Sequence, residues 1–291
     1  MGNARWSSVD WNAHATTSAL QSRAEIFTQS GMHPDLDPAR IEFRESCDSV
    51  NNPASTPIIL AADETGSMGV LAEHIIKRVL GVVMREIYDR KPVTDPHIMC
   101  MGFGDAYYDR APLQVTQFEA SVEPIVEQVR KIWLEGGGGG NNGESYMLPW
   151  LFAAYKTRCD AIRLRHRKGY LFTIGDESPI LTIQREHIQR FVGLPAERDM
   201  DAAAFLADVQ KDWHVFHLIV KPVGNQDVVA NWRRILGERA IMVDNIENMA
   251  ESIVSIIQVS EGQGGGDVVA SWTGPAQIAA RRIVTQLVPA T

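Results

Sequence analysis

Apolar runs and amphipathic stretches alternate along most of the chain, and this alternation predicts strands and helices in turn. The run 57–62 (PIILAA) is apolar throughout and ends at Asp63, which is typical of a strand buried in a parallel sheet. Apolar residues then recur at helical spacing through 66–89. The same patterns predict further strands at 97–103, 170–174, 213–220 and 240–243, and helices at 122–134, 144–157, 201–211, 227–236 and 246–258.

Strands that alternate with helices predict a parallel sheet covered by helices on both faces, because right-handed crossovers return each strand to the same sheet. Residues 112–118 alternate less cleanly and are expected to return antiparallel beside 97–103, with 104–111 as the hairpin loop. The predicted fold class is therefore α/β, with a doubly wound, mostly parallel, Rossmann-like central sheet.

The pattern divides the chain into three parts. Residues 1–56 are polar and weakly periodic, and we interpret them as an N-terminal extension that packs on the domain or on a partner. Residues 57–260 form the α/β domain. Residues 261–291 open with a glycine-rich linker, GQGGGD, and end in a segment where 277–287 is expected to be an amphipathic helix.

Composition and charge narrow the classes of function. The formal charge of −8 argues against nucleic-acid binding, which needs a dense Lys/Arg face, and the basic stretch 163–168 (RLRHRK) is interpreted as a solvated helix end. No run approaches the ~18 apolar residues of a membrane span, and no secretory signal is visible. Cys47, Cys100 and Cys159 are too scattered for a disulfide framework or a zinc site, which predicts reduced thiols in a cytoplasmic protein.

Three unusual loops fall where predicted strands end or helices begin. The first is 63–67 (DETGS), the second runs from the five glycines 136–140 to Ser145, and the third is 175–178 (GDES). Ligands of doubly wound sheets bind outside the carboxyl ends of strands, so these loops are expected to converge. Their carboxylates, hydroxyls and amides are oxygen ligands of the kind that Mg²⁺ prefers, and His and Cys are absent from them.

The string Asp63-Glu64-Thr65-Gly66-Ser67 resembles the Asp-x-Ser/Thr-x-Ser signature of the von Willebrand factor type A (vWA) family. In that family a metal-ion-dependent adhesion site, or MIDAS, joins this motif to a Thr or Asp of a second loop and an Asp of a third. The resemblance covers 57–260. It implies a metal site whose ligands are Asp63, Thr65, Ser67, Asp176 and, directly or through a water, Asn141, which stands where the family has Thr or Asp.

The resemblance also implies a binding function rather than an enzymatic one. The ion would be Mg²⁺, Mn²⁺ or Ca²⁺, and it would keep an open position for a carboxylate from a partner protein. Intracellular microbial members often work beside AAA+ ATPases. An ATPase of that class, or another subunit of a complex, is accordingly the partner that the resemblance implies.

Plainer interpretations stand beside this one. Thr65 or Ser67 could simply cap the helix that follows. Glu64 and Glu177 are expected to face solvent. Asp105 could support the site or only shape its hairpin.

An enzyme is the alternative class. Residues 65–69 (TGSMG) are similar to the nucleophile elbow of α/β serine hydrolases, with Ser67, Asp176 and His217 in the hydrolase order. Thr65 is larger than the glycine that the elbow requires, and Asp63 would have no role. No phosphate-binding loop with its lysine is present. The prediction is therefore a protein without enzymatic activity.

Overall fold

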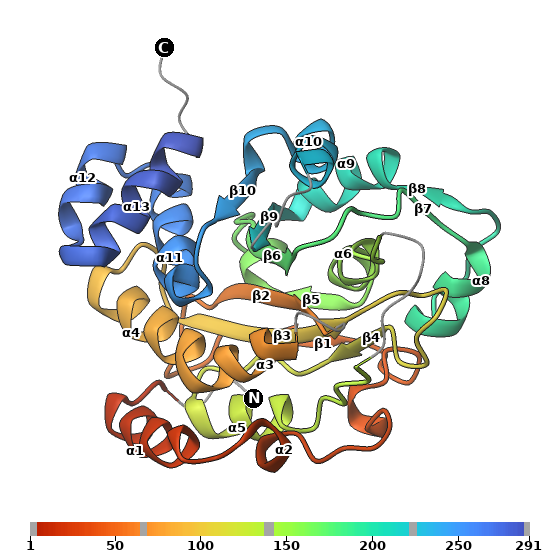
Figure 1. The fold of residues 1–291 in the computed structure, drawn as a ribbon, viewed down its shortest axis with the longest axis horizontal. Helices are drawn as coiled ribbons and strands as arrows, with labels where there is room; N and C mark the ends of the chain where they lie inside the picture. The colour runs from red at the N-terminus through yellow and green to blue at the C-terminus, as the bar shows by residue number, and fades with distance from the viewer. Residues whose placement is uncertain (1–4, 65–68, 137–142, 221–225, 288–291) are drawn as a thin grey trace.

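The computed structural model describes residues 5–64, 69–136, 143–220 and 226–287. Within these residues a six-stranded sheet forms the centre of the molecule (Figure 1). Five strands are parallel, and β4 is antiparallel to β3 at one edge. In spatial order the strands are β10 (Ala240–Val243), β9 (Trp213–Val220), β6 (Gly169–Gly175), β2 (Thr56–Asp63), β3 (Pro96–Phe103) and β4 (Leu113–Val115).

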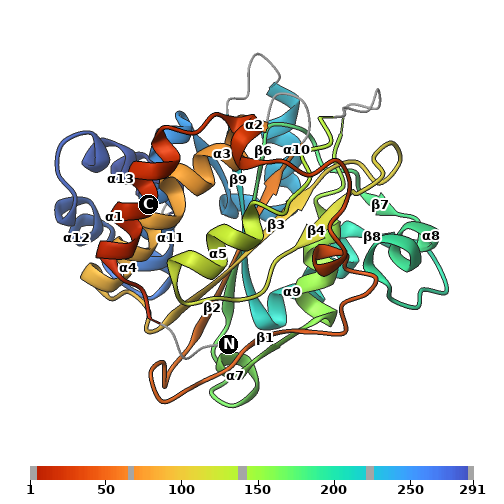
Figure 2. The same cartoon turned by 90° about the horizontal axis from the view of Figure 1, so that it is seen from below.

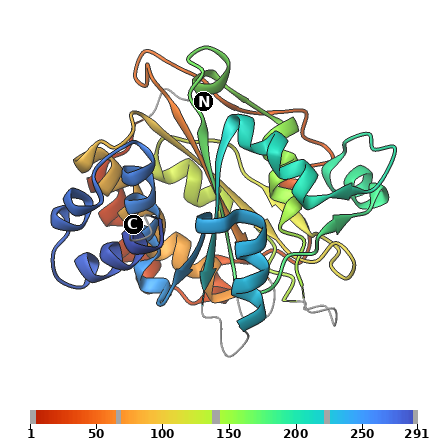
Figure 3. The ribbon, with the colours of Figure 1, turned by 90° about the horizontal axis from the view of Figure 1, so that it is seen from above.

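Helices cover both faces of this sheet, because every second residue of a buried strand points to the opposite face. On β2, Ile58 and Leu60 join one apolar core, while Ile59 and Ala61 join the other. Figures 2 and 3 show the strands running between the two groups of helices. The predicted doubly wound α/β fold is thus confirmed, including the antiparallel return of β4.

The first face carries helices from both ends of the chain. Its core receives residues of α4, α5, α11 and α13. The helices and turns on this side are α1 (Ser8–Ala19), α2 (Arg23–Ile26), α3 (Gly69–His74), the π-helical η3 (Ile75–Val79), α4 (Leu80–Arg90), α5 (Val122–Val129), η6 (Ile246–Asn248), α11 (Met249–Ser260), α12 (Gly265–Ser271) and α13 (Gly274–Leu287).

The second face is covered by helices from the middle of the chain. Its core receives residues of α6, α9 and α10. The elements on this side are α6 (Met147–Tyr155), α8 (Arg185–His187), the π-helical η4 (Ile188–Val192), α9 (Ala202–Asp212) and α10 (Gln226–Leu236), with the small antiparallel pair β7 (Thr182–Ile183) and β8 (Met200–Asp201). The short η5 (Gly237–Arg239) connects α10 to β10.

The described part of the N-terminal extension packs against the domain. Trp6, Trp11 and Phe27 contact the first core, and the Trp11 ring fills the space beside Gly81, where an added Cβ would lie 1.7 Å from it. Further along, β1 (Arg44–Ser46) pairs in parallel with β5 (Thr157–Cys159), and Asp160 of α7 (Asp160–Arg163) accepts a bond from the Asp48 amide. Whether 57 is a domain boundary stays a prediction.

The C-terminal segment differs from the sequence expectation in one respect. Helix α13 begins at Gly274, close to the expected amphipathic helix 277–287. The glycine-rich stretch, expected to be a linker, instead leads into helix α12, where Val268 is buried and the Val268 amide donates to the Gly264 carbonyl. Burial of Val268 and Trp272 gives this short helix the tertiary packing that glycine-rich sequence does not signal.

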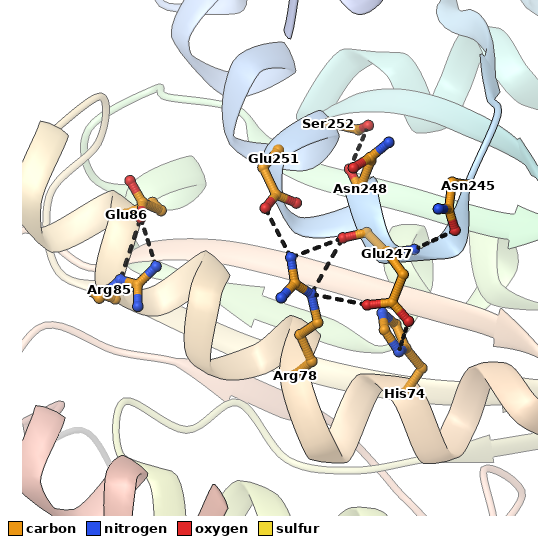
Figure 4. A network of polar contacts seen from close by, with 9 residues as sticks. All are labelled: His74, Arg78, Arg85, Glu86, Asn245, Glu247, Asn248, Glu251 and Ser252. Carbon is orange, nitrogen blue, oxygen red and sulfur yellow. Dashed lines mark hydrogen bonds and ion pairs between the residues drawn. The ribbon is translucent and has the colours of Figure 1, made fainter. Parts of the chain in front are cut away.

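Polar contacts fasten the helix that follows the first loop to the C-terminal part of the domain (Figure 4). The Arg78 guanidinium donates to the Glu247 carbonyl and to Glu251 Oε1, each at 3.0 Å. His74 Nδ1 lies 3.6 Å from Glu247 Oε1. Segment α3–η3 is therefore held against η6 and α11. Among the described helices, none has both the length and the apolar character that crossing a membrane requires.

Candidate metal centre

Asp63 is the last residue of β2, at the carboxyl edge of the sheet. Strand β2 lies between β3 and β6, so this carboxylate emerges near the middle of that edge. The residue is buried. A buried carboxylate is costly unless it is compensated, so its surroundings are informative about the chemistry of the site.

Asp176 follows β6, which is the parallel neighbour of β2. The last paired residues of the two strands are Ala62 and Ile174, so both carboxylates come within two residues of the same rung. The convergence expected from the sequence is therefore found for these two residues. Thr65, Ser67 and Asn141, the other three predicted ligands, lie outside the described residues.

Tyr146 connects the two strand ends. It is buried immediately before α6, and its hydroxyl donates to Asp63 Oδ2 at 3.4 Å and accepts from the Glu177 amide at 3.2 Å. Gly175 makes room for it, because an added Cβ there would lie 2.2 Å from the Tyr146 hydroxyl oxygen. Sequence reasoning missed Tyr146, since one aromatic residue at the start of an apolar helix carries no distinguishing signal.

Negative charge gathers around the Tyr146 hydroxyl. Burial raises the pKa of Tyr146 well above its ordinary value, and the nearby carboxylates Asp63, Glu144 and Asp176 raise it further. The hydroxyl therefore stays protonated and remains a donor to Asp63. Carboxylates that crowd together in a buried place favour a bound cation, which lowers their mutual repulsion.

Glu64 does not face solvent, contrary to the expectation from sequence. Its carboxyl group is buried against Gly102 and accepts a bond from Gln114 Nε2 at 2.9 Å. Burial raises the pKa of Glu64 well above its ordinary value, and the charge of Asp63 adds to the effect. The reason for the error is the neighbouring strand, since Gly102 of β3 leaves a space that β2 fills with its next side chain. Glu177, for which the same was expected, is half-buried.

The described part of the second loop is fixed to both of its neighbours. The Glu144 amide donates to the Ser178 carbonyl, and the Ile180 amide donates to the Glu144 carbonyl, both at 3.0 Å. Ser145 Oγ accepts from the Ala106 amide at 3.0 Å, in the loop that follows β3. Asp105 accepts from the Tyr107 amide and so shapes the hairpin, which is the simpler of its two predicted roles.

His217, the base in the hydrolase alternative, is buried on β9. Its ring stacks on Trp232 with centroids 3.6 Å apart, and Nδ1 lies 3.0 Å from Thr173 Oγ1. Burial lowers the pKa of His217 well below its ordinary value. These contacts are those of a packed core histidine.

The donor set fits a hard cation. Asp63 and Asp176 are oxygen ligands on adjacent strands, and the predicted hydroxyl and amide ligands would complete an all-oxygen site. Across the described ranges no three His, Cys, Asp or Glu residues are placed to hold a metal ion by themselves.

The sheet and its covering helices define a doubly wound α/β protein. No protein-family model matches the chain, and no curated protein matches it. Among solved structures, it is similar to the pilus adhesin SpaC from Lactobacillus rhamnosus GG, with a TM-score of 0.48 and 10% identity over 74% of this chain and 31% of the adhesin.

Two further solved structures are similar. A von Willebrand factor type A protein from Catenulispora acidiphila has a TM-score of 0.41 and 14% identity, over 81% of this chain and 52% of that one. The conserved hypothetical protein BatB from Bacteroides thetaiotaomicron has a TM-score of 0.39 and 12% identity, over 71% and 98%. The chain spans about a third of the adhesin's length, and similarity at this level carries no argument about a metal or a partner.

Proposed function

We propose that the chain is a vWA-type docking module that binds an acidic residue of a partner protein through a divalent cation. The observation that carries the proposal is the placement of Asp63 and Asp176 at the ends of adjacent parallel strands, connected through the Tyr146 hydroxyl. Thr65, Ser67 and Asn141 are the proposed neutral ligands, as the sequence resemblance implies. The proposed ion is Mg²⁺, with Mn²⁺ and Ca²⁺ as substitutes.

The charges of the ligands support a docking role. Asp63 and Asp176 together neutralise a divalent ion, while the hydroxyl and amide ligands add no charge. The bound ion keeps enough positive character to attract one more carboxylate at its open position. An acidic side chain on a partner protein supplies that carboxylate, and the ion then bridges the two proteins.

Exposed aromatic side chains on the hairpin loop between β3 and β4 offer further contact area. Tyr107 and Tyr108 are 43% and 61% exposed. Bonds within the loop hold its backbone, since the Asp105 amide donates to Asp109 Oδ2 at 2.7 Å and Ala106 is bonded to Ser145. Aromatic residues on a fixed backbone are effective anchors at protein interfaces, because little conformational freedom is lost on binding.

The proposed setting is the cytoplasm, within a complex that contains an AAA+ ATPase or a comparable subunit. This part of the proposal is supported by the sequence resemblance and by the cysteines, of which Cys100 and Cys159 are buried thiols without disulfide bonds. The proposal gives Ser67 a ligand role rather than a nucleophilic one. It gives His217 a structural role in the second core.

Capture of the partner tests the docking function. The immobilised chain is exposed to lysate of the cells that make it, with Mn²⁺, with EDTA, and with Mn²⁺ restored after EDTA. We expect a protein that is retained only when the ion is present and that Asp176→Ala does not retain. Losing one member of a buried charged pair costs about 2–5 kcal/mol, enough to remove a micromolar interaction.

The matched control for this capture is Asp208→Ala, which removes the same group from the surface of α9, where Asp208 pairs with Lys211. Circular dichroism establishes that both variants are folded. Undiminished retention by folded Asp176→Ala in EDTA would show that docking does not depend on the ion.

Tyr146 is expected to be a positioning residue for the ion. Tyr146→Phe removes the hydroxyl that orients Asp63 and the Glu177 amide while keeping the ring contacts, so Mn²⁺ affinity should fall about 10- to 100-fold, as for other groups that orient metal ligands. Calorimetric titration with Mn²⁺ measures the change. Tyr155→Phe at the exposed end of α6 is the control. If the two variants bind Mn²⁺ with equal affinity, Tyr146 does not position the ion.

A further inference from the structure

We propose a second binding site at the opposite edge of the sheet, a pocket that takes the phosphate group of a small phosphorylated molecule. The pocket has a volume of about 360 Å³. Its walls come from the segments that precede β2, β3 and β6, so it lies at the amino ends of three adjacent strands. The candidate metal centre lies at their carboxyl ends, and the two sites are therefore separated by the length of the sheet.

The lining combines apolar walls with cationic side chains. Ala54, Pro92, Val93 and Ala161 contribute the apolar part, and Ser55, Thr56 and Thr94 contribute hydroxyl groups. The charged residues are Lys91, Arg165, Arg167, Lys168 and Glu261. Four cations and one carboxylate around one pocket contrast with the net charge of −8 of the whole chain.

The partners of these cations decide how much positive charge remains. Arg165 is paired with Asp48, and Arg167 is paired with Glu261. Lys168 Nζ donates to the Gln210 carbonyl at 2.5 Å, which leaves its charge uncompensated. Lys91 has no carboxylate partner among the residues that the structure describes. Two positive charges therefore remain among the lining side chains, opposed by the Asp95 carboxylate that is bonded to the Ala54 amide. A phosphate monoester, with its charge of −1.5 to −2 near neutral pH, would pair with both lysines.

A neighbouring histidine lies close to two of the same cationic side chains. His214, on β9, has its pKa lowered to about 4, first by burial and then by the charges of Arg239, Lys168 and Arg167, with Glu261 acting in the opposite direction. Tyr170 lies between the histidine and the pocket, since its ring centroid is 5.1 Å from that of His214 and its hydroxyl donates to Glu261 Oε1 at 2.6 Å. Lys168 and Arg167 therefore contribute positive potential beside β6 and β9, while Asp95 and Asp48 contribute negative potential at His97 of β3.

The backbone around the pocket is the third observation. Within the described ranges, Lys91, Asp95 and His166 are the non-glycine residues with positive φ, at 50°, 39° and 53°. Lys91 lines the pocket, His166 stands between Arg165 and Arg167, and Asp95 follows Thr94. Lys91 adopts this conformation as the left-handed C-cap residue of α4, while Asp95 and His166 stand in the turns before β3 and β6.

The hydrogen bonds of Asp95 join two of the segments that line the pocket. Its carboxylate accepts from the Ala54 amide and its carbonyl accepts from the Thr56 amide, each at 3.0 Å. These bonds hold the segment before β2 against the segment before β3. The volume is at the lower end of the roughly 300–1,000 Å³ typical of small-molecule pockets. A small ligand fits this shape better than a polyanion such as nucleic acid.

Calorimetric titration of the full chain with inorganic phosphate, at constant ionic strength maintained with sodium chloride, tests the site. We expect one site in the wild type, and an affinity at least about tenfold lower in the double variant K91Q/K168Q, because that variant removes both uncompensated charges. The matched control is K131Q/K211Q, which removes the same charge from lysines outside the pocket that pair with surface carboxylates. Circular dichroism confirms that both are folded.

Two more probes identify the source of the phosphate. Glycerol 3-phosphate or adenosine monophosphate that binds more tightly than inorganic phosphate supports a phosphorylated small molecule held partly by the apolar walls. If inorganic phosphate binds more tightly than either compound, the ligand of the site is the free phosphate ion and not a phosphorylated molecule. Equal phosphate affinity in the wild type and K91Q/K168Q, or no binding of any probe at about 10 mM, contradicts the proposed site.

Discussion

Asp63→Ala is expected to lose about 2–5 kcal/mol of Mn²⁺ binding free energy, which is about 30-fold to several thousand-fold in Kd. Asp63 supplies half of the ionic charge that the site offers, and the Tyr146 hydroxyl is oriented toward it. Without this carboxylate the remaining ligands hold a divalent ion with only one full negative charge. Calorimetry with Mn²⁺ at constant pH measures the loss.

The same variant should not be less stable in EDTA. In the ion-free protein Asp63 is one of the carboxylates, with Glu144 and Asp176, that surround the Tyr146 hydroxyl, so its removal lowers their mutual repulsion and offsets the lost bond from Tyr146. We therefore expect the urea midpoint of Asp63→Ala in EDTA to equal or exceed that of the wild type. Asp244→Ala is the control, since Asp244 also follows a strand of this sheet but pairs with Arg282. Unchanged Mn²⁺ affinity in Asp63→Ala would contradict the proposed ligand set.

Gly102→Ala is expected to destabilise the fold by about 1–3 kcal/mol, the usual cost of overpacking a core. A Cβ at this position would lie 1.2 Å from Glu64 Oε1, so the carboxyl group must move. The Glu64 carboxyl group is buried and accepts a bond from Gln114 Nε2. Gln114 is itself held in place, because Nε2 also donates to the Trp133 carbonyl and Oε1 accepts from the Trp133 amide. Urea denaturation measures the change in the free energy of unfolding.

A second substitution tests whether the cost of Gly102→Ala comes from this clash or from the effect of any larger residue at this position of β3. Glu64→Ala empties the space, so Gly102→Ala should cost much less in the Glu64→Ala background than in the wild type. The two sites contact each other, and a coupling free energy of about 1 kcal/mol or more is expected from the double-mutant cycle. Additive effects of the two substitutions would mean that Glu64 does not occupy the space beside Gly102.

Much of the fold could be predicted because strand and helix periodicities differ and buried parallel strands are apolar throughout. Runs such as 57–62 and 240–243 are of this kind, and the structure has β2 and β10 there. Asp63 and Asp176 could be located for the same reason, since each stands at the end of such a run. What periodicity predicts is the position of a residue along its own strand.

The features that were missed depend on neighbours far away in the sequence. The burial of Glu64 follows from Gly102 on the next strand, and the role of Tyr146 follows from Gly175 and Asp63 together. Neither relation is visible in a local pattern. The pairing of β1 with β5 could not be predicted because each strand has three residues, too few to show an alternation of apolar and polar positions.

That small pair has a consequence for the order in which the protein can fold during its synthesis. Asp48, just after β1, is bonded to Asp160, which is 112 residues further along the chain. At a synthesis rate of about 5–20 residues per second, the first segment waits roughly 6–22 s for its partner to be made. Strand β1 is therefore translated well before its partner and cannot acquire its native pairing until residues 157–159 have been made, and until then a chaperone would find the apolar residues beside it accessible.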